Sequence, residues 1–129
     1  MDPRLQEMDF GKWELRPWDD IPWAEVEAWN ADLALYAPGG GETLTAVASR
    51  MWQAFDDLLA TPAEGVIVIC HAGSIRMLHA CAAWRAGQGA AVCPDVADFR
   101  DIALRAAAHR AEIPYARLLA LHVSASPTR

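Results

Sequence analysis

A chain of 129 residues, 53% hydrophobic and 22% charged, has the size and composition of a single globular domain. Its formal net charge of −6, without a block of lysine or arginine, argues against nucleic acid as a partner, and no apolar run approaches the roughly 20 residues that span a bilayer. The opening stretch MDPRLQEMDF lacks the apolar centre of a secretory signal, and the three cysteines lack C-x-x-C spacing. We therefore expect a cytoplasmic protein without disulfides or a zinc site.

The first half of the chain predicts two helices. Trp23, Val26 and Leu33 have helical spacing and indicate a helix over residues 22–36, with a proline in its first turn. The stretch APGGG, residues 37–41, breaks this helix. Apolar residues then recur at helical spacing and predict a second amphipathic helix over residues 42–59.

The second half of the chain predicts strands as well as helices. The run VIVIC, residues 66–70, is β-branched and does not alternate, which is typical of a strand buried on both faces of a parallel sheet. Helices are expected from Ser74 to about Ala86 and from Pro94 to about Arg110, followed by a last strand over 117–123. This order predicts an α/β layer protein, in which two strands are too few to complete the sheet.

The turn after the first expected strand has the features of an anion site. Free N–H groups at the start of a helix, together with the helix dipole, favour negative charge. Gly73 allows the backbone to approach a ligand closely, and Ser74 is a residue type that caps helices. His71 lies where open α/β sheets bind ligands, and its imidazolium could stabilise a phosphoryl group. The alternative is that His71 is a structural histidine and Arg76 a surface residue.

The same turn allows a second interpretation, based on Cys70 and Arg76. Their C-x5-R spacing is typical of cysteine-dependent phosphatases, in which a thiolate attacks phosphorus while N–H groups and the arginine hold the oxygens. A cysteine at the end of a buried strand is otherwise inert packing. Cys70 is therefore an alternative nucleophile, with Arg76 as its partner.

Three motifs occur in a fixed order along the chain: PRLQEMDFGKWE (3–14), PGGGETLTAVASR (38–50) and VIVICHAGSIRML (66–78). Together they resemble the histidine phosphatase superfamily, the phosphoglycerate mutase-like group. The stretch IPYARLLAL (113–121) is similar to the closing strand of that group. Within the group the chain is most similar to the α-ribazole phosphatases of cobalamin synthesis. The resemblance implies a three-layer α/β/α fold, phosphomonoesterase activity on a phosphorylated small molecule, and no cofactor or metal ion.

The resemblance also implies which residues form the active site. Glu7 matches the carboxyl group that donates a proton to the leaving oxygen, a role that requires partial desolvation. His71 matches the histidine that contacts the transferred phosphoryl group. Contacts from backbone N–H groups would come from the next three residues, Ala72, Gly73 and Ser74.

Other motif residues are expected at the edge of the pocket or in supporting positions. Gly41 and Glu42 match a segment that faces the pocket, although Glu42 is also suited to complementing the dipole of the helix that follows it. The turn at residues 11–14 is expected to be structural. We expect a structural role for Arg50 and Arg76 as well.

One motif of the resembled group is missing. Arg-His-Gly, whose histidine becomes phosphorylated, does not occur in these 129 residues. We therefore expect one partial domain over residues 1–129, truncated at its N-terminus, with an incomplete and mostly parallel sheet. Such a chain should be nearly inactive alone because it lacks the nucleophile. The alternatives are the Cys70-dependent phosphatase and a non-enzymatic remnant or assembly module, which would form a homodimer through an exposed sheet edge.

Overall fold

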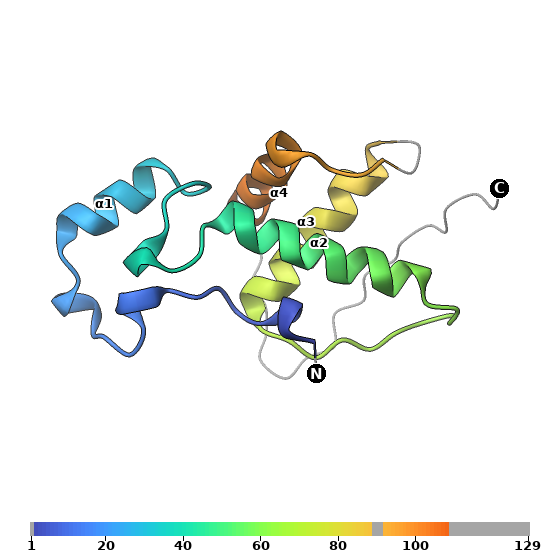
Figure 1. Cartoon of the computed structure of the whole chain (residues 1–129), viewed down its shortest axis with the longest axis horizontal. Coiled ribbons are helices and arrows are strands. Elements are labelled where there is room, and N and C mark those ends of the chain that lie inside the picture. The colour runs from blue at the N-terminus through green and yellow to red at the C-terminus, as the bar shows by residue number, and fades with distance from the viewer. Residues whose placement is uncertain (1, 89–91, 109–129) are drawn as a thin grey trace.

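The computed structural model describes residues 2–88 and 92–108. Its α-helices are α1 (Trp23–Ala31), α2 (Leu44–Ala60), α3 (Ala72–Ala86) and α4 (Val96–Ala108). Its short 3-10 helices are η1 (Pro3–Leu5), η2 (Gly11–Trp13), η3 (Trp18–Asp20) and η4 (Pro38–Gly40). Figure 1 shows α2, α3 and α4 gathered together, while α1 and the turns beside it lie apart from them. No helix in the described part is long and apolar enough to cross a membrane.

Helices α2, α3 and α4 pack against one another and enclose the hydrophobic core. Each contributes fully buried side chains, which include Met51 from α2, Met77 and Cys81 from α3, and Ile102 from α4. The indole rings of Trp52 and Trp84 join α2 to α3 in an edge-to-face contact, with centroids 5.4 Å apart. The core is therefore made by apolar faces of helices.

The N-terminal part of the chain forms a smaller aromatic cluster around Trp13. This indole is buried and makes edge-to-face contacts with Trp29 of α1 and with Trp18, at centroid distances of 5.7 and 6.1 Å. Gly11 and Gly39 let η2 and η4 approach each other, because both have positive φ and a Cβ on either would collide with the backbone of the other turn.

The expected three-layer α/β/α fold, with its incomplete parallel sheet, is wrong. The described residues contain helices and extended segments but no strand. The run at 66–70 is extended, yet its backbone forms no hydrogen bond with any described residue, and a strand exists only through such pairing. It is not buried on both faces either, because Ile67 and Ile69 are 79% and 93% exposed. The expected strand over 117–123 lies outside the described residues.

The predicted helices are present with shifted ends. The helix expected over 42–59 corresponds to α2, where the Oγ1 atom of Thr43 caps the first turn by accepting a hydrogen bond from Ala46 N at 3.1 Å. The helix expected over 22–36 ends early, at Ala31, since the Asp32 carboxylate accepts from Leu35 N and forms a turn. The expected helix from 74 begins two residues earlier, and the one from 94 begins at Val96.

Candidate functional site at the start of helix α3

Helix α3 begins immediately after His71, which is its N-cap residue. The His71 carbonyl accepts the first helical hydrogen bond, from Ile75 N at 2.9 Å, while its imidazole is exposed and makes no capping bond. The N–H groups of Ala72, Gly73 and Ser74 have no carbonyl partner within the helix. The imidazole and these N–H groups therefore lie at the positive end of the helix dipole, where an anion is favoured.

The Ser74 side chain has a structural task. It is fully buried, and its hydroxyl donates a hydrogen bond to the carbonyl oxygen of Leu5 at 2.8 Å. This contact joins the first turn of α3 to the segment that leads into Glu7. Its hydroxyl is therefore engaged, and the backbone N–H is the group of Ser74 that can contact a phosphate.

Glu7 is brought to the start of α3, although 65 residues separate it from Gly73 in the sequence. A Cβ on Gly73 would collide with Glu7 Oε1 and would come within 3.0 Å of the Glu7 Cδ and Oε2 atoms. Glu7 is exposed, so the partial desolvation expected for a proton donor is not present in this structure. Its Oε1 atom accepts a hydrogen bond from Met8 N at 3.1 Å. The structure thus places together Glu7 and the turn that the sequence paired with it.

The segment that carries Glu7 is held by Arg50 of α2. Arg50 Nη1 donates to the carbonyl oxygens of Arg4 at 2.7 Å and Gln6 at 2.8 Å, and Nη2 donates to that of Glu7 at 3.3 Å. The guanidinium also forms a two-pronged pair with Glu42, with Nε to Oε2 at 2.8 Å and Nη2 to Oε1 at 2.9 Å. Arg50 is therefore the residue that fixes the path of the backbone from residue 4 to residue 7.

Glu42 completes this arrangement, which we call the Arg50–Glu42 clamp. Its Oε1 atom accepts from Asp9 N at 2.9 Å, while Glu42 N donates to Asp9 O at 2.8 Å. The hydrogen bond from Arg50 lowers the pKa of Glu42 below its ordinary value, against an opposing effect of burial. Gly41 precedes the clamp, and its backbone packs so tightly against Asp9 that a Cβ there would collide with Asp9 O. Gly41 and Glu42 therefore both contact Asp9, in the segment before η2.

The structural role expected for Arg50 agrees with these contacts, but the sequence did not reveal what Arg50 holds. The available signal was an arginine on α2 directly before Met51, next to positions that face the core. Carbonyl oxygens of an irregular segment leave no pattern in a sequence, so the partners of Arg50 could not be named. The tertiary structure supplies them.

Cys70, the alternative nucleophile, is poorly suited to attack phosphorus. Burial raises the pKa of the Cys70 thiol, and the negative charge of Glu7 raises it further, while the backbone N–H of His71 acts in the opposite direction. A reactive cysteine requires a lowered pKa. Arg76 has a buried Nε atom without a hydrogen-bond partner, and nothing in the described residues explains that atom.

No group of histidine, cysteine and acidic side chains in the described part is arranged to hold a metal ion. A family model described as the histidine phosphatase superfamily (branch 1) matches residues 1–91. That range contains Glu7, the Gly41–Glu42 segment and the turn after residue 70. The curated proteins and the solved structures that were searched gave no match.

Proposed function

This chain belongs to the histidine phosphatase superfamily (branch 1), and from that premise we propose that it binds a phosphomonoester at the start of α3. The single observation that carries the proposal is the placement of Glu7 beside Gly73, two residues after the exposed His71. A carboxyl group, an imidazole and the N–H groups at the start of a helix are parts that phosphoryl transfer uses.

Each residue has a distinct task in this proposal. The backbone N–H groups of residues 72–74 hold the equatorial oxygens of the phosphoryl group, and the helix dipole favours its charge. His71, when protonated, stabilises the same oxygens. Glu7 donates a proton to the leaving oxygen, and the Arg50–Glu42 clamp sets the position of the Glu7 backbone.

The nucleophile is the part that these residues do not supply. None of the four histidines in the sequence lies in Arg-His-Gly, so we propose that the chain as given binds phosphomonoesters but hydrolyses them slowly. The resemblance to α-ribazole phosphatases supports a phosphorylated small molecule of that kind as the substrate, without a cofactor. All three cysteines are free thiols, which supports a reducing compartment such as the cytoplasm.

Binding and turnover should be measured separately. We expect titration with α-ribazole 5′-phosphate or inorganic phosphate to show saturable binding that His71→Ala weakens roughly tenfold, about 1.4 kcal/mol. Lys12→Ala, which removes an exposed positive charge from η2, is the matched control and should leave binding unchanged. Absence of binding, or equal loss in both variants, would refute the site.

Turnover of p-nitrophenyl phosphate is expected to stay near the rate without protein. Robust hydrolysis that disappears in His71→Ala would show that the catalytic machinery is complete after all. Hydrolysis that disappears in Cys70→Ser but survives in His71→Ala would instead favour the thiol mechanism.

A further inference from the structure

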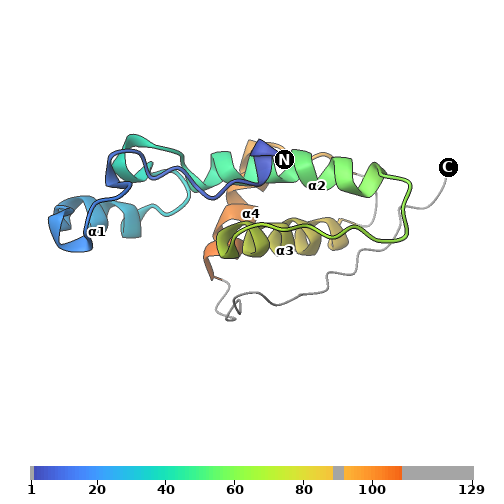
Figure 2. The ribbon, with the colours of Figure 1, turned by 90° about the horizontal axis from the view of Figure 1, so that it is seen from below.

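The extended segment at residues 66–70 has a backbone that pairs with no other segment in the described part of the chain. It belongs to the connection from the end of α2 to the start of α3 and follows the lower margin of the molecule in Figure 1. In the view from below in Figure 2 it passes in front of α3. None of its N–H or carbonyl groups forms a hydrogen bond with a described residue. A straight, β-branched segment with free donors and acceptors is a template for pairing with another strand.

The side chains of this segment already alternate as they do in a strand. Val68 and Cys70 are partly buried and pack against the helical core, whereas Ile67 and Ile69 are 79% and 93% exposed. The inward pair packs the segment against the hydrophobic core. The outer face therefore presents two neighbouring isoleucines to solvent.

We propose that this segment pairs with the same segment of a second copy of the chain, in an antiparallel arrangement centred on Val68. In that register Ile67 of each copy lies opposite Ile69 of the other, and the four isoleucines form a single apolar strip on one face. Cross-strand pairs of β-branched residues stabilise antiparallel strands. A two-fold interface needs a surface that complements itself, and the sequence VIVIC meets this condition about its central residue.

The segment itself carries no charge. Residues 65–70 contain no acidic or basic side chain, so the isoleucines of two copies meet without a like-charge contact inside the strip. Each chain nevertheless carries a net charge of −6, and the charge of Glu7 acts on Cys70 at one end of the segment, so the charges around the strip oppose association.

The size of the contact sets the strength that we expect. A pair of five-residue strands is smaller than the roughly 1,600 Å² of a standard stable interface, so the dimer should dissociate on dilution. Because the two copies carry like net charge, added salt should strengthen their association.

Sedimentation over a concentration series tests the interface. We expect the full chain to dimerise reversibly, and the double variant Ile67→Lys/Ile69→Lys to dimerise at least roughly tenfold more weakly because it places four positive charges in the strip. The matched control, Leu15→Lys/Leu35→Lys, adds the same charge at two exposed leucines outside the segment and should behave like the unsubstituted chain. A chain that stays monomeric at every concentration, or equal weakening in both variants, overturns the proposal.

Disulfide trapping tests the register. In a background of Cys70→Ser, Cys81→Ala and Cys93→Ser, we expect a mixture of the Ile67→Cys and Ile69→Cys chains, tagged to differ in size, to form mixed disulfides faster than either chain alone. Equal rates in all three samples would mean a different register or disordered aggregation. Dimers that form without mixed disulfides would place the contact elsewhere, and either result rejects the antiparallel pairing.

Discussion

Glu7 is the residue whose position depends most on the tertiary structure. Its carboxylate lies against Gly73, and its charge reaches the Cys70 thiol, whose pKa is raised first by burial and then by Glu7. Glycine at residue 73 is required for this contact, since a Cβ would occupy the place of Glu7 Oε1. The thiol of Cys70 is therefore an internal probe of where the Glu7 carboxylate lies.

We predict that Glu7→Gln lowers the pKa of Cys70 toward its ordinary value while leaving it raised. The substitution removes the negative charge, but the burial of the thiol, which is the larger cause, remains. The measurement is the rate of iodoacetamide alkylation against pH in a Cys93→Ser background, since Cys93 is exposed. Alkylation at pH 8 should become faster. Cys81 will contribute little because burial raises its pKa to about 12.

Glu14→Gln is the matched control for this experiment. It removes an exposed carboxylate that accepts a hydrogen bond from Phe10 N, within the N-terminal turns. The alkylation profile of Cys70 should not change in this variant. An unchanged profile in Glu7→Gln as well would mean that the carboxylate is not beside the thiol in solution, and the candidate site would lose its proton donor.

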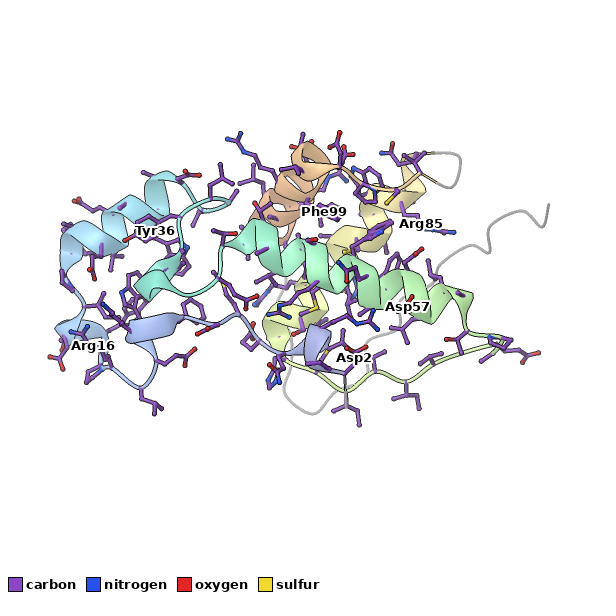
Figure 3. The ribbon with its side chains drawn as sticks, viewed as in Figure 1. Asp2, Arg16, Tyr36, Asp57, Arg85 and Phe99 are labelled. Atoms are coloured by element: carbon purple, nitrogen blue, oxygen red, sulfur yellow. The ribbon has the colours of Figure 1, made fainter. Side chains whose placement is uncertain are left out.

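At the scale of elements, α2 organises the N-terminal segment. Figure 3 shows Asp2, in the turn before η1, close to α2, which carries Asp57. Arg4 joins them, with Nη2 to Asp2 Oδ2 at 2.7 Å and Nη1 to Asp57 Oδ2 at 2.6 Å. The Arg4 and Asp2 side chains are 33% and 32% exposed and that of Asp57 is 67% exposed, and pairs so open to solvent stabilise little. The Arg50–Glu42 clamp is better shielded, with side chains 20% and 26% exposed, and it makes the larger contribution.

We predict that Arg50→Met lowers the free energy of unfolding at pH 7 by about 2 kcal/mol, because charge-assisted hydrogen bonds to Glu42 and to three carbonyl groups are lost. The free energy of unfolding of Arg50→Lys should lie between those of the unsubstituted chain and Arg50→Met, since an ammonium group cannot form the two-pronged pair with Glu42. Urea unfolding measures both variants. Arg100→Met, which removes an exposed arginine from α4, is the control and should change stability little.

The cost of Arg50→Met should depend on pH in a definite direction. The pKa of Glu42 is lowered in the folded chain, so its stabilising contribution is present above the ordinary value of 4.5 and is lost as the pH falls through the folded value. The difference between the unsubstituted chain and Arg50→Met should therefore shrink as the pH falls below 4.5. A difference that stays constant over this range would show that Arg50 acts only through the carbonyl groups.

At the scale of the whole molecule, α2, α3 and α4 form the stable unit to which the N-terminal turns are attached. Figure 3 shows Phe99 on α4 on the side toward α3, and Phe99 packs against the core from a partly buried position. Ile102, one turn further along, is completely buried, whereas Leu104 on the same helix is 41% exposed. These two residues differ in burial while sharing the same helix.

We predict that Ile102→Ala lowers the free energy of unfolding by about 3 kcal/mol, because it leaves a cavity among three helices. Leu104→Ala, which removes a similar side chain from the exposed side of α4, should cost less than about 1 kcal/mol. Urea unfolding followed by tryptophan fluorescence measures both, since Trp52 and Trp84 lie in the core. Equal costs would mean that α4 does not pack as described.

Helices were the most predictable part of this chain. Residues 42–59 showed the spacing of an amphipathic helix, and α2 follows it closely because its apolar face is what the core buries. The start of α3 was predicted within two residues, since the helix expected from Ser74 begins at Ala72. The match of the family model to residues 1–91 agrees with the motifs that pointed to that superfamily.

The interpretation of VIVIC failed for a physical reason. A strand is defined by hydrogen bonds to a neighbour, and β-branched composition alone does not provide that neighbour within residues 2–88 and 92–108. The local sequence did predict the extended conformation, but not the alternation in burial between Val68 and Ile69. Their environments, one against the helices and one in solvent, were set by which side the helices cover.

By itself, the sequence determined most of the helical segments and membership of a phosphatase superfamily, because these depend on local spacing and on motifs. Only the tertiary structure decided that Glu7 lies against Gly73, that Arg50 holds the Glu7 backbone, and that residues 66–70 pair with no segment among residues 2–88 and 92–108. Contacts between distant residues depend on how the helices pack, and carbonyl groups and unfilled strand edges have no side-chain signature along the chain.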